Sequence, residues 1–217
     1  MKINNARNNI LNRLKTSLKS ESEPVAHDVP DSLDWSVDDR VRHFSKQLQA
    51  ANAEVHDATK DNWLITLKHI CSTKRLKNLL FSPATPWGAQ ILERSYEFPT
   101  FKHFDYPIDE WKPALFDGID AAFTSTHGGI AETGTIILWP DTHEPRLISL
   151  VPPVHIALVE KTEIYSTFAD ALKTQNWIKT GLPTNILLIS GPSKSADIEQ
   201  TLTYGVHGPK ELVIILV

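Results

Sequence analysis

The sequence predicts an α/β fold with a mixed, largely parallel sheet flanked by helices. Short continuous runs of Ile, Leu and Val dominate the second half of the chain, and such runs are typical of strands that are buried on both faces. Amphipathic helical patterns separate these runs, which favours parallel strands joined by helices. Closely spaced runs between Gly118 and Val159 indicate that some strand pairs are antiparallel.

The length of 217 residues suits one α/β domain preceded by an N-terminal segment. We expect residues 1–35 to form a basic helix and a mobile linker, and residues 36–217 to form the α/β domain. In the helix, Ile10, Leu11 and Leu14 recur at helical spacing among basic residues, without the apolar stretch of a secretory signal. We expect this helix to dock on its own protein or on a partner, and a mitochondrial presequence or a surface-binding helix is the alternative.

Composition limits the classes of partner and cofactor. The formal net charge of -4 gives no reason to expect binding to nucleic acid. The sequence contains no run of about 18 apolar residues, so no membrane span is predicted. The single cysteine, Cys71, excludes an intrachain disulfide and an iron–sulfur cluster held by several thiolates of this chain. The cofactor is otherwise unknown. We expect a cytoplasmic protein.

Helical patterns dominate the first half of the domain. We expect helices over residues 37–53, with Ser36 as the N-cap, over 61–71, and over 87–94 after Pro86. Short strands are expected at Val55, at 79–81 and at 101–106.

The second half reads mainly as strands. We expect them at 118–126, 136–139, 146–151, 154–159, 184–189 and 212–216. Helices are expected over 166–178 and from about Ser195.

The first candidate site is the loop after the apolar run that ends at Ile189. Small residues followed by a helix start resemble an anion site in outline, with Ser193, Lys194 and Ser195 as anion-binding residues. The phosphate-loop spacing is absent, and acidic residues follow. A plain helix cap by Ser195 explains the pattern equally well.

The second candidate lies between two apolar strands. Gly128 and Gly129 would let a backbone approach a bound anion closely, and Glu132 would be a nucleophile or general base. Alternatively, Glu132 caps a turn or pairs with Arg146 or Lys194.

The third candidate is His207, in a Gly- and Pro-containing turn before the last strand, where it could carry protons. A turn histidine bonded to backbone is the alternative. His155 precedes an apolar run and reads more simply as a satisfied core group. The histidines lack a metal-binding spacing, so no metal site is predicted.

Four segments in order carry a resemblance to a known family. They are residues 129–135 (GIAETGT), 152–159 (PPVHIALV), 190–199 (SGPSKSADIE) and 205–209 (GVHGP). Their order and spacing resemble the LUD-domain family, most of all its lactate-utilisation members, over roughly residues 36–217. Ser195 stands where a threonine is expected, and it keeps the hydroxyl.

The resemblance implies a fold similar to the superfamily of CoA-transferases, ribose-5-phosphate isomerase and glucosamine-6-phosphate deaminase. It also implies a part in lactate utilisation as a carbon source, by oxidation of L-lactate to pyruvate. The chain would act beside two partner subunits that carry iron–sulfur motifs. It implies no catalytic mechanism for this subunit.

Two functions from different classes follow. The chain is a non-redox subunit of a lactate-oxidising complex, serving assembly, substrate binding or regulation. Alternatively, it is a stand-alone enzyme acting on a small anionic, phosphorylated or acyl-thioester metabolite. In the second case Glu132 is base or nucleophile, Lys194 binds the anion and His207 carries a proton.

Overall fold

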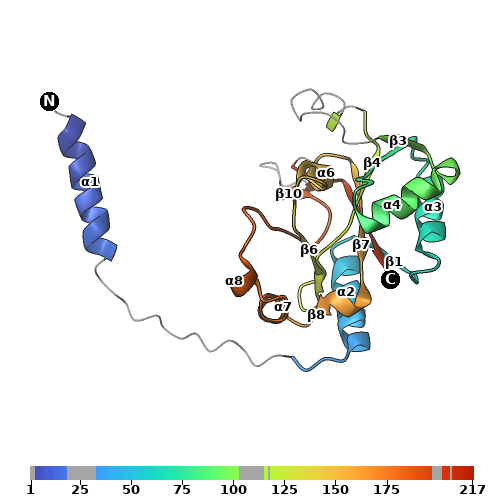
Figure 1. Ribbon diagram of the computed structural model, residues 1–217, viewed down its shortest axis with the longest axis horizontal. Helices are drawn as coiled ribbons and strands as arrows, with labels where there is room; N and C mark the ends of the chain where they lie inside the picture. The colour runs from blue at the N-terminus through green and yellow to red at the C-terminus, as the bar shows by residue number, and fades with distance from the viewer. Residues whose placement is uncertain (1–2, 19–32, 103–114, 117, 197–201, 206) are drawn as a thin grey trace. The chain divides into compact units, whose positions relative to one another are not determined.

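The computed structural model describes residues 3–18, 33–102, 115–116, 118–196, 202–205 and 207–217 (Figure 1). Contacts divide the chain into Met1–Asp31 and Ser32–Val217, and each unit is described by itself. In the first unit, helix α1 spans Ile3–Leu18, as expected. The expected domain boundary between residues 35 and 36 stays a prediction, and most of the expected linker, residues 20–32, lies outside the described residues.

A six-stranded parallel sheet forms the centre of the second unit. Its strands, in spatial order, are β1 (Glu54–Asp57), β12 (Glu211–Leu216), β7 (Val154–Val159), β4 (Ala121–Thr124), β2 (Asn78–Leu80) and β3 (Thr100–Lys102). Every neighbouring pair is parallel. The buried strands β4 and β7 lie in the middle of the sheet, which explains their continuous apolar sequences.

The antiparallel pairs that the sequence indicates lie in a second sheet. Its strands, in order, are β8 (Ile164–Tyr165), β5 (Gly129–Ile130), β6 (Thr135–Leu138) and β9 (Leu187–Ile189). Strand β5 pairs with β8 in parallel, and the other two pairs are antiparallel. A separate antiparallel pair joins β10 (Lys194–Ala196) to β11 (Leu202–Tyr204).

The helices of the second unit are α2 (Val37–Ala50), α3 (Trp63–Thr73), α4 (Pro86–Glu93), α6 (Leu147–Leu150), α7 (Phe168–Thr174) and α8 (Trp177–Thr180), with 3₁₀ turns at Ser95–Glu97 and Lys161–Glu163. Side-chain caps mark the starts of helices α2, α4 and α7. The Ser36 hydroxyl accepts a hydrogen bond from the Asp39 amide at the start of α2. Thr85 caps α4 in the same way, with Pro86 in the first turn.

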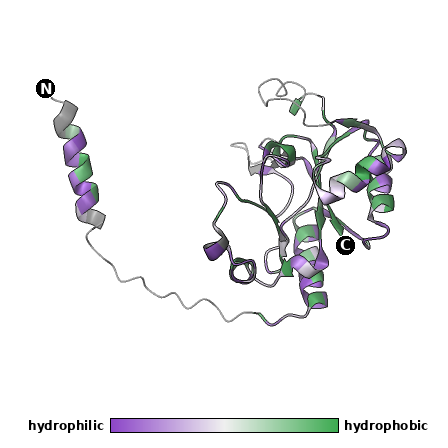
Figure 2. Cartoon of the chain, viewed as in Figure 1, coloured by the Kyte–Doolittle hydropathy of each residue, from purple (hydrophilic) through white to green (hydrophobic). Residues whose placement is uncertain are grey.

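The packing forms layers on both faces of the parallel sheet. Helices α3 and α4 cover one face, where Trp63, Leu67 and Ile91 are buried. Helix α2 inserts Phe44 and Leu48 between the other face and the four-stranded sheet. Helix α7 covers the outer side of the four-stranded sheet. Helix α2 in Figure 2 accordingly carries both green and purple segments.

Three expected elements differ from the structure. The strand expected over 146–151 is wrong, because residues 147–150 form helix α6, and a short apolar run does not distinguish helix from strand. The helix expected over 166–178 is interrupted at Asn176, which has a φ of 56° and separates α7 from α8. The helix expected from Ser195 is wrong at its start, where Lys194–Ala196 is strand β10, and residues 197–201 lie outside the described part.

Candidate functional site

A small cavity lies at the carboxyl end of strand β4, where parallel α/β sheets usually place their binding sites. Its volume is about 80 Å³, enough for roughly five to eight water molecules or one small organic acid. The lining residues are Thr85, Thr124, Ser125, His127, Leu138, Trp139, Pro140, Asp141, Glu144, Pro145 and Ser149. These residues come from β4 and the loop after it, from the N-cap of α4, and from the stretch that runs from the end of β6 into α6.

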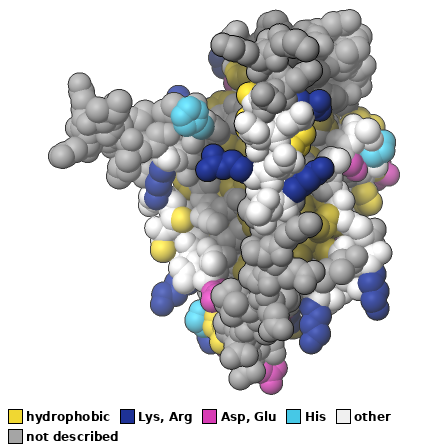
Figure 3. Space-filling model, turned by 90° about the vertical axis from the view of Figure 1, so that its left-hand side faces the viewer, with side chains coloured by type: hydrophobic (Ala, Val, Ile, Leu, Met, Phe, Trp, Pro, Cys, Tyr) yellow, Lys and Arg dark blue, Asp and Glu magenta, His cyan; other side chains and the backbone are white. Residues whose placement is uncertain are grey.

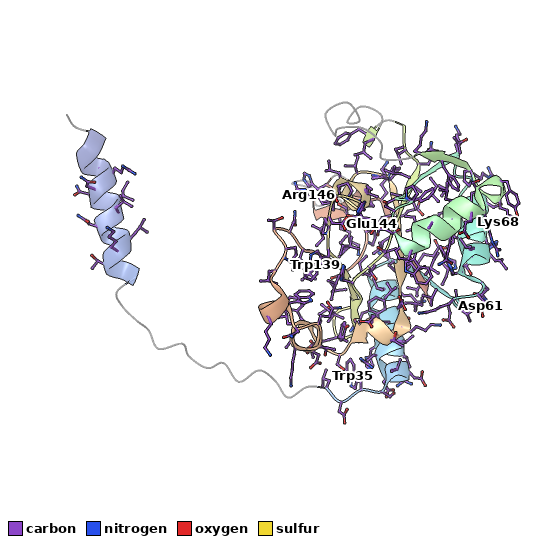
Figure 4. The ribbon with its side chains drawn as sticks, viewed as in Figure 1. Trp35, Asp61, Lys68, Trp139, Glu144 and Arg146 are labelled. Atoms are coloured by element: carbon purple, nitrogen blue, oxygen red, sulfur yellow. The ribbon has the colours of Figure 1, made fainter. Side chains whose placement is uncertain are left out.

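The Glu144 carboxylate is fixed by the end of β4. Ser125 follows the last residue of that strand, and its backbone amide donates to Glu144 Oε1 at 3.0 Å. The Ser125 hydroxyl donates to Glu144 Oε2 at 2.5 Å. Figure 4 shows Glu144 and Trp139 on the same side of the unit, away from Asp61 and Lys68. The carboxylate is thus held in one position at the cavity wall.

A tight turn brings Glu144 to this position. Asp141 accepts hydrogen bonds from the backbone amides of His143 and Glu144, both at 2.7 Å. Asp side chains commonly stabilise turns in this way. The turn follows β6 directly, so its geometry is anchored to the four-stranded sheet.

Aromatic rings form another part of the wall. The His127 and Trp139 ring centroids are 5.0 Å apart, and Trp139 packs edge-to-face on Trp177 at 5.2 Å. The Trp177 indole donates to the Gln175 side chain, whose amide in turn donates to the His127 carbonyl. The wall is therefore held from α7 and α8 as well as from the sheet.

The pKa values of two groups at the cavity move toward each other. Burial raises the pKa of Glu144, Asp141 adds to the increase, and the Ser125 hydrogen bonds oppose it. Burial of the ring against its neighbours lowers the pKa of His127, although the residue as a whole is exposed. A carboxyl group and an imidazole with converging pKa values can exchange protons with a bound ligand.

A buried histidine stands behind the cavity. His155 of β7 is fully buried, and its Nε2 lies 2.8 Å from the Thr124 hydroxyl oxygen. Its Nδ1 has no hydrogen-bond partner. Burial lowers the pKa of His155 to about 3, so the ring is neutral at ordinary pH. The expected satisfied core histidine therefore has one satisfied nitrogen and one unsatisfied nitrogen.

The glycines and the carboxylate of the second predicted site lie at the other end of this region. Glu132 is exposed in the turn between β5 and β6, so the length of β6 separates it from the cavity. A Cβ on Gly128 would meet the Glu163 carbonyl oxygen at 2.2 Å, and one on Gly129 would meet the Phe44 ring at 2.6 Å. Protein atoms thus fill the space that these glycines leave, and roles for the three residues in binding or catalysis stay predictions.

The remaining predicted site residues gather near the amino ends of β7 and β12. The Ser193 amide donates to the Pro209 carbonyl, and the Lys210 amide donates to the Pro153 carbonyl, directly before β7. His207 is exposed in this loop, and Lys194 is exposed in β10. Ser195 lies in β10. Anion binding by Ser193, Lys194 and Ser195 and proton transfer by His207 therefore stay predictions, and strand β10 occupies the position at which the helix start was expected.

Sequence reasoning did not identify Glu144 and Ser125 as site residues. Their signal is weak: a polar turn after an apolar strand, and a serine at the end of another strand. The two residues are 19 positions apart. Backbone hydrogen bonds of His127 and Gly128 with Ile137 of β6, together with the turn at Asp141, bring their segments together.

Other chemistry on the described residues is sparse. Within the described ranges no cluster of three or more His, Cys, Asp or Glu side chains could hold a metal ion, and no helix is long and apolar enough to cross a membrane. Cys71 lies on the buried side of α3, in the hydrophobic core, and burial raises the pKa of its thiol to about 12. Figure 3 shows the Lys and Arg side chains of one face as separate groups rather than one continuous basic surface.

Comparisons with known proteins place the chain in a family. The family model for the LUD domain matches residues 41–217. An uncharacterized protein of Neisseria meningitidis serogroup B is 39% identical over 219 residues, covering 98% of this chain and 93% of that protein. Lactate utilization protein C 1 of Bacillus mycoides is 30% identical over 198 residues, covering 86% of this chain and 85% of that protein.

A solved structure supports the same fold. The crystal structure of a DUF162 family protein from Deinococcus radiodurans has a TM-score of 0.59, with 19% identity, and the match covers 84% of this chain and 99% of that chain. At this identity the likeness concerns the fold alone. Because the family model spans most of the chain and the relatives match over nearly their full length, the chain belongs to the LUD-domain family.

Proposed function

We propose that this chain is a non-redox, ligand-binding subunit of a cytoplasmic system that oxidises L-lactate to pyruvate. The observation that carries the proposal is the similarity to lactate utilization protein C 1 of Bacillus mycoides, which extends over most of both chains. Other proteins named lactate utilization protein C, from Macrococcus caseolyticus and Shouchella clausii, are 43% and 38% identical over shorter stretches.

The cysteine content supports a role without its own redox cluster. One thiol cannot supply the several thiolates that iron–sulfur clusters take from cysteine. That thiol is buried among core side chains, where the thiolate form is disfavoured. Electrons from lactate would therefore pass through partner subunits that carry iron–sulfur clusters, and this chain would bind substrate or hold the assembly together.

A stand-alone enzyme is the second candidate, and one observation favours it. Glu144 is a carboxyl group with a raised pKa, held in a cavity by a hydroxyl and an amide. Such a group can act as a general acid or base on a small metabolite. For this second function, Glu132, Lys194 and His207, which were predicted from the sequence, form an alternative site. Its substrate would be a small anionic, phosphorylated or acyl-thioester metabolite.

Growth on L-lactate as sole carbon source tests the function. A deletion strain is complemented with the wild-type chain, with Glu144→Gln, with Glu132→Gln, and with Glu93→Gln as a control at an exposed position on α4. We expect growth to require the chain, and Glu144→Gln to impair it while the Glu93 variant does not. Equal protein levels on blots and normal growth on another carbon source exclude expression effects.

The outcomes separate the candidate sites. Failure of Glu132→Gln alone would move the working site to the turn between β5 and β6. Normal growth of the deletion strain on lactate would count against the proposed function itself.

Partner capture tests the subunit role. Purification of the tagged chain under mild anaerobic conditions should recover cysteine-rich proteins whose absorption spectra contain iron–sulfur bands. The purified chain alone should not turn over L-lactate with an artificial electron acceptor, whereas the captured assembly should. Lactate oxidation by the isolated chain would support the stand-alone enzyme instead.

A further inference from the structure

The buried histidine behind the cavity has a definite choice of tautomer. His155 is neutral, so only one of its two ring nitrogens carries a hydrogen. If Nδ1 carries it, a buried N–H donor has no partner. If Nε2 carries it, the N–H donates to the Thr124 hydroxyl oxygen 2.8 Å away and only a lone pair at Nδ1 stays unpaired. Unpaired buried N–H groups are rarer in proteins than under-satisfied acceptors, which favours the Nε2–H form.

This tautomer decides what Thr124 offers to the cavity. A hydroxyl has one hydrogen to donate and two lone pairs that accept. When its oxygen accepts from His155, its own hydrogen is left for another partner. Thr124 is only 3% exposed, and it lines the cavity. The hydrogen is therefore available to an acceptor atom that enters there.

Glu144 supplies the complementary group. Ser125 donates to both carboxylate oxygens, with the amide shared between Oε1 at 3.0 Å and Oε2 at 3.3 Å. A carboxylate has about four lone-pair positions, so it retains room to accept one more hydrogen bond. The cavity thus presents one hydroxyl donor and one carboxylate acceptor, in a volume of about 80 Å³.

Negative charge on a ligand is compatible with this cavity despite its two acidic residues. Asp141 is occupied by two backbone amides, which disperse its charge. Thr85, the N-cap of α4, lies in the wall, so the positive end of that helix faces the region. A carboxylate near Thr124 and a hydroxyl near Glu144 would satisfy both sides at once.

We propose that His155 holds Thr124 as a hydrogen-bond donor toward the cavity, and that the cavity binds a small 2-hydroxy acid. The ligand's carboxylate accepts from Thr124, and its 2-hydroxyl donates to Glu144. His155 is a positioning residue that acts through Thr124. The choice of a 2-hydroxy acid rests on the proposed function in lactate oxidation, whereas the tautomer of His155 does not depend on it.

The first test reads the tautomer directly in the full-length chain. Two-bond ¹H–¹⁵N spectra of protein labelled with ¹⁵N at histidine distinguish a protonated Nε2 from a protonated Nδ1, and a His155→Gln variant assigns the signal. We expect the Nε2–H form in the ligand-free protein near neutral pH. The Nδ1–H form would overturn the proposal, because Thr124 would then have to donate to His155.

The second test measures binding of L-lactate and propionate by calorimetry or NMR titration near neutral pH. Propionate lacks the 2-hydroxyl, and we expect it to bind roughly tenfold more weakly than L-lactate, as the loss of one hydrogen bond implies. Thr124→Val should weaken L-lactate binding by a similar factor, and Thr124→Ser should restore most of it. Thr162→Val, at an exposed position away from the cavity, controls for the loss of a hydroxyl.

Equal affinities of L-lactate and propionate, or an unchanged affinity in Thr124→Val, would overturn the ligand assignment. The growth experiment is independent of both. A deletion strain that cannot use lactate while the chain fails to bind L-lactate would remove this inference and keep the proposed function. If L-lactate binds as expected but the deletion strain grows normally on lactate, the inference would stand and the proposed function would fall.

Discussion

Ser125 donates two kinds of hydrogen bond to Glu144, one from its backbone amide and one from its hydroxyl, and so fixes a partly buried carboxylate at the carboxyl end of β4. The two residues belong to different loops, and their contact couples the end of β4 in the parallel sheet to the turn that comes after β6 of the four-stranded sheet. The ionised form gains from these bonds, but burial and Asp141 oppose it, and the pKa of Glu144 is raised as a result.

Glu144 should make stability depend on pH in a defined direction. Because its pKa is higher in the folded state, the folded chain binds more protons above the unfolded value of about 4.3. Its contribution to the free energy of unfolding is therefore complete below that value and is lost as pH rises through the folded pKa. The difference between wild type and Glu144→Gln should fall with rising pH, by up to about 1.4 kcal/mol per pH unit within that window. Denaturant unfolding across a pH series measures it.

Ser125→Ala provides the matched control for Glu144. It removes the hydrogen bond from the hydroxyl but keeps the carboxyl group, so the pKa of Glu144 should rise further. The pH range over which stability falls should therefore extend to higher pH. A pH profile of Glu144→Gln that is parallel to wild type would contradict the assignment.

His155 should cause loss of stability in acid. Burial lowers the pKa of His155 to about 3, whereas the unfolded chain takes up the proton near pH 6.5. Its contribution is present above about pH 6.5 and is lost as pH falls toward 3, with a limiting slope of about 1.4 kcal/mol per pH unit. His155→Gln cannot titrate and can still donate to Thr124, so it should flatten the slope between these pH values. Urea unfolding at several pH values checks this, and an unchanged slope would show that His155 is protonated in the fold.

The elements of the first half were predictable from local signals. Ser36 and Thr85 act as caps, and the apolar spacing around Phe44 and Leu67 places the buried faces of their helices. Longer strands such as β7 were predictable because their apolar runs are unbroken. The short segment 147–150 was not, since four residues fit a helix turn and a strand equally well.

The candidate site was much harder to predict than the fold. Its principal contact joins Glu144 to Ser125, and neither has a spacing that marks it in the sequence. Glu132 was a candidate because a charged residue between two apolar strands is expected to be buried. The turn between β5 and β6 instead exposes its side chain to solvent. Burial of a charged group depends on which loops fold over it, and that is a tertiary property.

Cys71 should be nearly inert toward thiol reagents in the folded chain. Burial raises the pKa of its thiol to about 12, from 9.0 for a free cysteine, so at pH 8 the reactive thiolate is roughly a thousandfold rarer than in the unfolded chain. Labelling with a maleimide, followed by mass spectrometry, should be slow without denaturant and fast in concentrated guanidinium. Rapid labelling of the native chain would mean that the buried side of α3 becomes exposed readily.

Gly129 should be required for packing rather than for binding an acid. A Cβ at this position would lie 2.6 Å from the Phe44 ring, so Gly129→Ala should destabilise the fold by about 1–3 kcal/mol. Phe44→Leu removes the opposing ring atoms, and the double variant should therefore be less destabilised than the sum of the two single variants. Urea unfolding of the four proteins gives the coupling energy. Additive destabilisation in the double variant would contradict the steric explanation. If Gly129→Ala lost L-lactate affinity without losing stability, a role for this glycine in ligand binding would be supported instead.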